Sequence, residues 1–523
     1  MNEIIYLGTT TYRNQEIKFG IKLDDRRRHF YVVGKTGMGK TTLLENMSVQ
    51  DIKEGHGIGI IDPHGGFAQK ILKYIPKERI EDVIYFDPSD LDFPFAFNVM
   101  EKVDPSLRSI VASGLVGVFK KIWWESWGPR LEYLLRNAIM ALLEVEGSTL
   151  LSIMRLLIDK EYRKEVIEKI TDPVIKTFWK EEFARYSNQF QTEAVAPIQN
   201  KVGQYITSPL VRNIVGQKKT SINLREIMDE GKILIVNLSK GKIGEDNSTL
   251  LGALLITKLQ LAAMSRVDLE EEKRKDFFLY VDEFQNFATE SFATILSEAR
   301  KYHLNLILSH QYINQLPDIV RDAIFGNVGS FVVFRVGASD AEFLSQEFYP
   351  LSIEDLCNLP KYHTCVKLMI DGVASNPFIA RTLPPLPAPE IYYIDEIIQN
   401  SRKKYSRKRE EVEAEIAKEW LKEREVYPAY CWVCQKEITV PFPPDPKRPV
   451  YCKECKERIE KGEIKPPSAP PKSLIEKGII VSLEELREKE PEKPKAKPKV
   501  TPDLEAIRKS LKESLKEIDN ENK

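Results

Sequence analysis

A phosphate-binding loop is the clearest chemical signal in this sequence. Residues 34–41, GKTGMGKT, satisfy the pattern GxxxxGK[ST] and stand between an apolar run, FYVV, and a helical stretch, TTLLENMSVQDI. Glycines let several backbone N–H groups face one anion at the start of the following helix. In this pattern Lys40 reaches the β- and γ-phosphates of ATP, and the Thr41 hydroxyl ligates Mg²⁺. The expected nucleotide-binding residues here are Gly34, Lys35, Thr36, Gly37, Met38, Gly39, Lys40, Thr41 and Thr42.

An acidic pair at the end of another apolar run completes the expected site. The run FFLYV, at residues 277–281, leads directly into Asp282 and Glu283. We expect Asp282 to hold the Mg²⁺ shell and Glu283 to act as general base on the attacking water. A glutamate at this position favours a hydrolase over a passive nucleotide-binding switch. The alternative is an ordinary acidic pair at a strand end.

Gln311 and Arg300 are candidates for two further catalytic roles. Gln311 ends the stretch LNLILSHQ, and we expect its amide to sense the γ-phosphate beside Lys40 and Glu283. Otherwise it is a capping amide. Arg300, eleven residues upstream, lies near a helix C-terminus, where the helix dipole favours a cation. The sharper hypothesis is an arginine finger that reaches a neighbouring subunit's site and neutralises charge in the transition state.

Four of the six cysteines form two CxxC pairs that are separated by seventeen residues. Two-residue spacing lets both thiolates of a pair face one ion, and two such pairs complete a tetrahedral Zn²⁺ site. Four thiolates leave no open position, so a structural ion is expected, and a redox dithiol is the alternative. The segment also resembles small zinc-ribbon modules with the same VPF…RPVYC lettering. Nearby Arg448, Lys453 and Lys456 either touch nucleic acid or protein or form a solvated basic rim. The expected zinc ligands are Cys431, Cys434, Cys452 and Cys455.

Several short apolar runs end in a polar or glycine-bearing turn. Such runs without alternation, separated by helical stretches, are typical of buried parallel strands in an α/β sheet. In open parallel sheets, ligands gather beyond the carboxyl ends of the strands, where these polar residues fall. The runs are FYVV before Gly34, IGII before Asp62, ILIV before Asn237, FFLYV before Asp282, LNLILS before His310 and SFVVF before Arg335.

Changes in composition predict the domain organisation. Stretches such as PRLEYLLRNAIMALLEVEG have apolar residues at three- and four-residue spacing and predict a helical insertion. The proline- and lysine-rich EKEPEKPKAKPKVTP cannot support a core. The expected divisions are a short lead-in at 1–28, an ATPase core at 29–103 and 226–384, an all-helical insertion at 104–225, a proline-rich linker and charged helix at 385–428, the zinc ribbon at 429–460, and a largely disordered tail with a short terminal helix at 461–523.

Bulk composition sets limits on partners and compartment. The chain has 523 residues and a net charge of −1, so any affinity for nucleic acid must come from local basic patches. Its N-terminus lacks the order of a signal peptide, and no apolar run approaches the roughly 20 residues of a membrane span. A cytoplasmic protein is expected, reaching a membrane only through a partner, and its cysteine pairs then suggest metal rather than disulfides.

These motifs, in this order, resemble the HerA/FtsK superfamily of DNA-pumping ATPases, and most nearly the conjugative coupling proteins of TraG/TraD type. The resemblance rests on GKTGMGKTTL, IIDPHGGF, WGPRLEYLLRNAIMALLE, YVDEFQNFA, EARKYHLNLILSHQ and FGNVGSFVVFRVGASDAE. It implies a RecA-like P-loop core that forms a ring, most simply a hexamer, around DNA. Arg300 then falls on the arginine that acts in trans, with Arg130 and Arg335 as rivals. Anchored coupling proteins begin with transmembrane helices and repair-associated members with a β-barrel, and neither is expected here.

The sequence therefore predicts an ATP-driven DNA translocase that holds backbone phosphates, in conjugation or mobilisation, with a relaxase or secretion-channel proteins as partners. Lys240 and Lys242, in SKGKIGEDN, are the predicted phosphate contacts. One alternative is a secretion motor for protein cargo, and another is an ATP-switched assembly scaffold. Of the weaker motifs, DRRRH at 25–29 is a candidate subunit boundary. Asp62 and His64 suggest a hydrogen-bonded turn rather than a metal site.

Overall fold

The structure is a computed structural model that describes residues 4–420, 427–440, 444–445 and 448–467. The chain separates into two compact units, Met1–Trp420 and Leu421–Lys523. The predicted tail at 461–523 falls mostly outside the described residues, as does its terminal helix.

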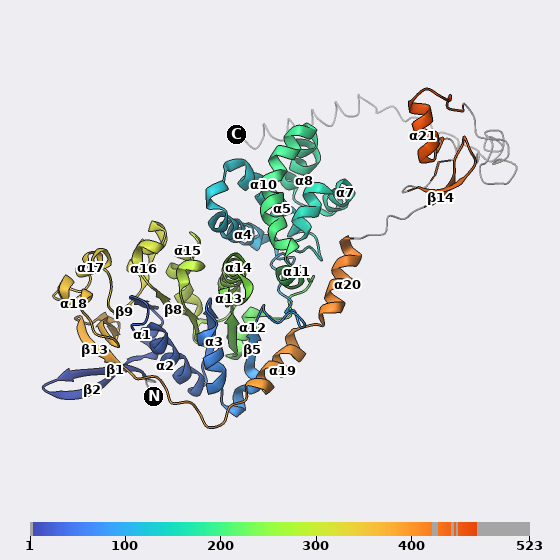
Figure 1. Ribbon diagram of the computed structural model, residues 1–523. Helices are drawn as coiled ribbons and strands as arrows, with labels where there is room; N and C mark the ends of the chain where they lie inside the picture. Colours follow the sequence, from blue (N-terminus) through green and yellow to red (C-terminus); the bar gives the residue numbers. More distant parts are fainter. Residues whose placement is uncertain (1–3, 421–426, 441–443, 446–447, 468–523) are drawn as a thin grey trace, which may run out of the picture. The chain divides into compact units, whose positions relative to one another are not determined.

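A single large sheet of eleven strands organises the first unit (Figure 1). Its strand order is β2-β1-β13-β10-β9-β3-β8-β7-β4-β6-β5. The strands are β1 (Ile4–Tyr12), β2 (Gln15–Lys22), β3 (Phe30–Val33), β4 (Gly57–Asp62), β5 (Val83–Phe86), β6 (Ile233–Asn237), β7 (Phe277–Val281), β8 (Leu304–His310), β9 (Ser330–Val333), β10 (His363–Lys367) and β13 (Phe378–Thr382).

The strands from β9 to β5 are parallel, and those from β9 outward to β2 are antiparallel. All six apolar runs predicted as buried strands form the parallel part, which β5 completes. The predicted α/β class with a mainly parallel sheet is therefore confirmed. Strands β3, β8, β7 and β4 are consecutive neighbours, so the residues that follow them gather at one edge of the sheet.

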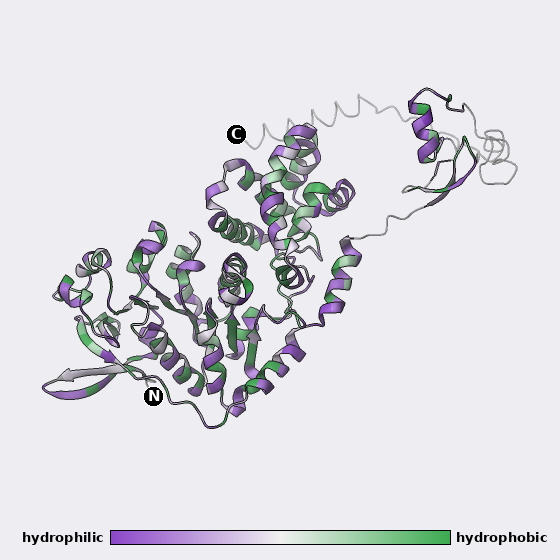
Figure 2. Ribbon diagram, in the orientation of Figure 1, coloured by the Kyte–Doolittle hydropathy of each residue, from purple (hydrophilic) through white to green (hydrophobic). Residues whose placement is uncertain are grey.

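Both faces of the parallel part of the sheet are buried, because alternate residues of these strands enter two separate cores. In β3, Phe30 and Val32 belong to one core, whereas Tyr31 and Val33 belong to the other. Helices α2 and α3 cover the first face, which Phe30 and Val32 enter. The second core, which Tyr31 and Val33 enter, extends into the helical insertion. Figure 2 shows the apolar strands between polar outer helices.

The helices of the first unit lie on both faces of the sheet (Figure 1). Every regular element from Pro105 to Val215 is helical. The helices are α1 (Leu23–Arg26), α2 (Lys40–Lys53), α3 (Gly66–Ile71), α4 (Arg108–Ile122), α5 (Pro129–Leu142), α6 (Ser152–Ile158), α7 (Lys160–Lys169), α8 (Pro173–Thr177), α9 (Phe183–Arg185), α10 (Asn188–Thr207), α11 (Pro209–Val215), α12 (Leu224–Glu230), α13 (Lys240–Ile243), α14 (Glu245–Met264), α15 (Phe292–Glu298), α16 (Asp318–Asn327), α17 (Ala338–Ser345), α18 (Ile353–Cys357), α19 (Ile394–Tyr405) and α20 (Arg409–Trp420).

One helix among the described residues, Glu245–Asp268, is long and apolar enough to cross a membrane by length and composition. It contains α14, which packs against α4 and α12. Inside the protein, 61% of its apolar window is buried. These contacts are those of a core helix, because the second core of the sheet includes Leu250, Leu254 and Leu259.

The structure differs from the sequence prediction at both ends of the first unit. Within the expected lead-in at 1–28, residues 4–22 form the hairpin β1–β2, which extends the sheet through the pairing of β1 with β13. The charged stretch expected as an exposed helix forms two helices, α19 and α20, instead. Their apolar residues Ile397 and Val412 are fully buried. Sparse apolar positions in a highly charged stretch gave little indication of this packing.

The second unit is described by itself. A hairpin of β14 (Tyr427–Tyr430) and β15 (Glu437–Val440) precedes helix α21 (Lys453–Glu460). Among its described residues, two small apolar clusters form, one of Ala429, Val440 and Val450 and one around Trp432. A short hairpin, β11 (Met369–Ile370) and β12 (Val373–Ala374), completes the strands of the described chain and belongs to the first unit.

Candidate functional site

The phosphate loop follows β3 and leads into α2. Gly37 and Gly39 have φ angles of 79° and 120°, in the left-handed region that favours glycine. A Cβ atom on Gly39 would also lie 2.7 Å from the ring of Tyr362. The Lys40 ammonium turns back over the loop and donates to the carbonyl oxygen of Gly34 at 2.7 Å. Burial lowers the pKa of Lys40, and the nearby charges of Glu283 and Asp282 oppose that shift.

The acidic pair lies beside this loop. Asp282 follows β7, and its Oδ2 lies 3.4 Å from the Thr41 hydroxyl, which donates to it. Burial, together with the charges of Asp62 and Glu283, raises the pKa of Asp282 to about 6. A buried carboxylate and a hydroxyl at the mouth of a phosphate loop are oxygen ligands of the kind that Mg²⁺ accepts. The donor set therefore fits the predicted magnesium ion.

Glu283 has an unusual backbone and two amide partners. Its φ is 45°, which is left-handed for a residue other than glycine. Gln311, directly after β8, donates its Nε2 to Glu283 Oε1 at 3.1 Å. Gln311 thus lies beside Glu283, and its predicted role in sensing the γ-phosphate beside Lys40 stays a prediction. The second partner, Gln285, donates to Oε2 at 2.7 Å and was not predicted. Gln285 lies within the motif YVDEFQNFA, but neither its type nor its spacing indicates which side chain it contacts.

The three candidate arginines lie in different settings. Arg300 is exposed in the short turn η9 (Ala299–Tyr302), and its guanidinium makes no hydrogen bond or ion pair with the described residues. Arg130 is also exposed and lies 5.6 Å from the centre of the Phe190 ring. Arg335 follows β9, and its carbonyl oxygen accepts from Lys35 of the phosphate loop. Only Arg335 thus adjoins the loop of its own chain.

Two of the weaker sequence motifs have structural roles. The Asp62 carboxylate accepts from the backbone N–H groups of His64 and Ala68, so the hydrogen-bonded turn is confirmed. In DRRRH, the Arg26 guanidinium is fully buried and bonds Asp51 at 2.6 and 2.7 Å. The hypothesis that DRRRH lines a subunit boundary is therefore wrong for Arg26.

The predicted phosphate-contacting lysines lie in α13, not in a loop. The Lys240 ammonium bonds Glu245 Oε1 at 2.7 Å and Asn286 Oδ1 at 2.8 Å. Lys242 is exposed. Lys242 therefore remains available for a polyanion, whereas Lys240 must exchange its present partners to bind one.

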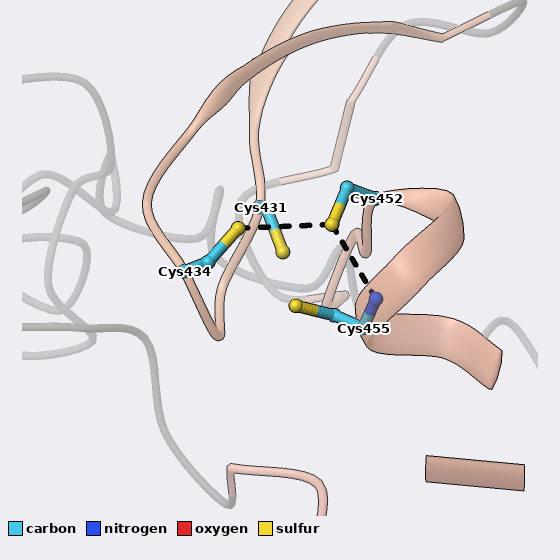
Figure 3. Close-up of side chains that lie close together, drawn as sticks. All are labelled: Cys431, Cys434, Cys452 and Cys455. Atoms are coloured by element: carbon cyan, nitrogen blue, oxygen red, sulfur yellow. Dashed lines mark hydrogen bonds between the residues drawn. The ribbon is translucent and has the colours of Figure 1, made fainter. Parts of the chain in front are cut away.

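The four predicted zinc ligands converge in the second unit (Figure 3). Cys431 and Cys434 lie in the hairpin after β14, Cys452 caps α21, and Cys455 lies in its first turn. Their sulfur atoms all lie within 4.8 Å of one another, and the cysteines are not joined by disulfides. This is the donor set that tetrahedral Zn²⁺ takes. The helix is an element that the zinc-ribbon prediction did not include.

Each of the two units matches a model of a known protein family. A family model described as the type IV secretion-system coupling protein DNA-binding domain matches residues 17–348, more than half of the chain. A second model, described as a probable treble clef zinc finger, matches residues 424–459.

Individual proteins show the same relationship at low identity. The type 4 coupling protein DotL of Legionella pneumophila is 21% identical over 372 residues, covering 59% of this chain and 46% of that protein. The chain thus spans about half the length of this relative. Plasmid coupling protein TrwB in complex with ADP and Mg²⁺ has a TM-score of 0.51 at 15% identity, over 74% of this chain and 96% of that one. TrwB with a non-hydrolysable ATP analogue has a TM-score of 0.50 at 17% identity, over 71% and 87%. These structures establish a shared fold.

Proposed function

Because this chain belongs to the type IV secretion-system coupling protein family, we propose that it is an ATP-hydrolysing motor that moves DNA without sequence preference. One observation carries this proposal. Lys40, Asp282 and Glu283 gather at the carboxyl ends of β3 and β7, with Gln311 bonded to the glutamate. TrwB, which shares the fold, has been solved with ADP and Mg²⁺ and with an ATP analogue.

Each residue of the site has its own role in hydrolysis. The loop N–H groups and Lys40 hold the triphosphate, and Thr41 and Asp282 hold its Mg²⁺, which neutralises phosphate charge. Glu283 orients and deprotonates the attacking water. Its neighbour Gln311 is placed to report the presence of the γ-phosphate.

The proposed assembly is a ring of identical subunits, most simply a hexamer, with Arg300 completing the neighbouring site. Arg300 is exposed and lacks a partner among the described residues, as a residue that acts in trans requires. Mixing two kinds of variant subunit tests directly whether Arg300 acts in trans. The variants Arg300→Ala and Lys40→Met should each be inactive, whereas mixed rings should regain hydrolysis, because Lys40→Met subunits still present Arg300. No recovery on mixing, in rings shown to exchange subunits, would remove Arg300 from this role and favour Arg335.

DNA is the proposed cargo, with relaxase or channel proteins as partners at the membrane. Contacts to backbone phosphates should weaken steeply with salt. We expect duplex DNA of mixed sequence to stimulate ATP hydrolysis at low salt. Glu283→Gln should lower hydrolysis by about 100-fold or more while nucleotide still binds. Indifference to DNA at low salt would favour protein cargo, and a chain that stays monomeric with nucleotide and DNA would exclude the ring.

A further inference from the structure

The carboxylate of Glu283 is restrained from both sides. Gln311 bonds one oxygen and Gln285 the other, and the Glu283 side chain is 7% exposed. These hydrogen bonds occupy both carboxylate oxygens, which an attacking water would otherwise face. They also fix its orientation. A general base held by two amides is therefore poorly placed to take a proton from water.

Gln285 itself is incompletely satisfied. It lies in the turn η8 (Phe284–Asn286), and its side-chain oxygen is buried without a hydrogen-bond partner. Such an oxygen carries a desolvation cost that solvation or a new partner would relieve. The amide nitrogen of Gln285 is thus well placed on Glu283, whereas its amide oxygen is in an unfavourable, desolvated position. This arrangement is suited to a contact that breaks during function.

Two ammonium groups from outside the sheet hold the same turn. Lys121 of α4, in the helical insertion, donates to the carbonyl oxygen of Gln285 at 2.9 Å. Lys240 of α13 donates to Asn286 Oδ1 at 2.8 Å. The Asn286 amide in turn donates to the carbonyl oxygen of Glu283 at 2.7 Å. The Lys240 ammonium is attracted to phosphate, so a polyanion can compete for it.

We propose that Gln285 is a positioning residue that holds Glu283 inactive until a polyanion draws Lys240 away from the turn. This inference rests on the proposed function and adds a device that limits ATP hydrolysis in the absence of DNA. Lys121 links the turn to α4, so displacement of the insertion acts on the same contact. When the turn loosens, Gln285 releases Oε2, and this oxygen can then face the attacking water.

The test compares ATP hydrolysis by the full chain with and without duplex DNA. In Gln285→Leu the DNA-free kcat should rise about 10-fold, the effect of losing one hydrogen bond to a charged group, with KM for ATP unchanged. The DNA-saturated rate should stay close to that of the wild type, so the stimulation ratio falls toward one. Gln189→Leu is the matched control, because Gln189 bonds Glu193 on an exposed helix at 3.0 Å.

A second variant addresses the trigger. Lys240→Met should also raise the DNA-free rate and lose stimulation, whereas Lys273→Met, at an exposed lysine paired with Glu270, should do neither. Inorganic polyphosphate in place of DNA should stimulate the wild type if phosphate charge is the signal, and failure to do so would overturn the electrostatic trigger.

The outcomes separate the two proposals. A folded wild type that hydrolyses no ATP under any condition would remove the proposed function. A stimulated wild type whose Gln285→Leu variant keeps the same basal rate would overturn the restraint alone. Loss of activity in that variant, with and without DNA and with ATP still bound, would make Gln285 a support of the active geometry and would overturn the restraint as well.

Discussion

The nucleotide site and the cysteine cluster are built in opposite ways. Residues of the nucleotide site extend from strands that two cores bury on both faces, so their positions depend on packing. Among the described residues of the second unit, four apolar side chains other than cysteine are buried, too few to fix four sulfur atoms. In the first unit, packing of the core positions the site residues. The second unit, by contrast, is expected to depend on a bound metal for its folding.

Metal removal should give the largest difference between the two units. Structural zinc contributes about 10–16 kcal/mol to the folding of small modules at neutral pH. A strong chelator should therefore unfold the module around Cys431 and Cys455 and leave the first unit folded. Hydrogen exchange checks this: amides of 427–440 and 448–460 should lose protection, and those of β3 and β7 should keep it. Unchanged protection in the module, with zinc shown to be absent, would contradict it.

Breaking the buried ion pair of the first unit should have the next largest effect. Arg26 and Asp51 are fully buried, and the Tyr280 hydroxyl also bonds Asp51. Asp51→Ala leaves a buried cation without its partner and should cost about 3–5 kcal/mol in free energy of unfolding.

Denaturant unfolding followed by circular dichroism measures this cost, and zinc content should not change. Asp24→Ala is the control, since the Asp24 pair with Arg27 is exposed and should contribute less than about 1 kcal/mol. Equal effects of the two variants would contradict the assigned role of the buried pair.

Removing a charge from the nucleotide site should separate function from stability. Lys40→Met should weaken ATP binding by about 10- to 100-fold, the effect of one or more charged hydrogen bonds. Its free energy of unfolding should stay equal or rise, because burial already disfavours the ammonium. Titration calorimetry measures the loss of ATP affinity, and denaturant unfolding measures the free energy of unfolding. Lys53→Met, at the exposed end of the same helix, is the control, and a similar loss of affinity there would contradict the prediction.

A smaller, pH-dependent effect is expected at Lys121. Burial lowers the pKa of Lys121 from 10.5 to about 8. Below pH 8 the amine is protonated in both the folded and the unfolded state, so the cost of burying its charge is fully present. Between pH 8 and 10.5 the folded state releases the proton first, and stability rises as that cost disappears.

Lys121→Met should therefore be more stable than the wild type by about 1–3 kcal/mol at pH 7.5, with the difference shrinking toward pH 10.5. Denaturant unfolding across this range measures it. The adjacent Lys120, exposed and paired with Glu290, supplies the control variant Lys120→Met, whose small effect should not vary with pH in this window. A constant difference for Lys121→Met would contradict the shifted pKa.

Short-range patterns in the sequence were sufficient to select the candidate site residues. The phosphate loop, the Asp282–Glu283 pair and the cysteine spacing each depend on residues that are close along the chain, and the six apolar runs were long enough to identify as strands. Gln285 could not be found in this way. Its role depends on a left-handed Glu283 and on Lys121, which approaches from a helix more than 160 residues away.

By itself, therefore, the sequence determined which side chains are candidate ligands of phosphate, magnesium and zinc, because ligand type and local spacing identify such candidates. Only the tertiary structure decided how these groups restrain one another. In the folded chain Arg26 lies in the core, Lys240 donates to Asn286, and each oxygen of Glu283 accepts from a glutamine amide. The physical reason is that a hydrogen bond between distant elements depends on their packing, which local composition does not encode.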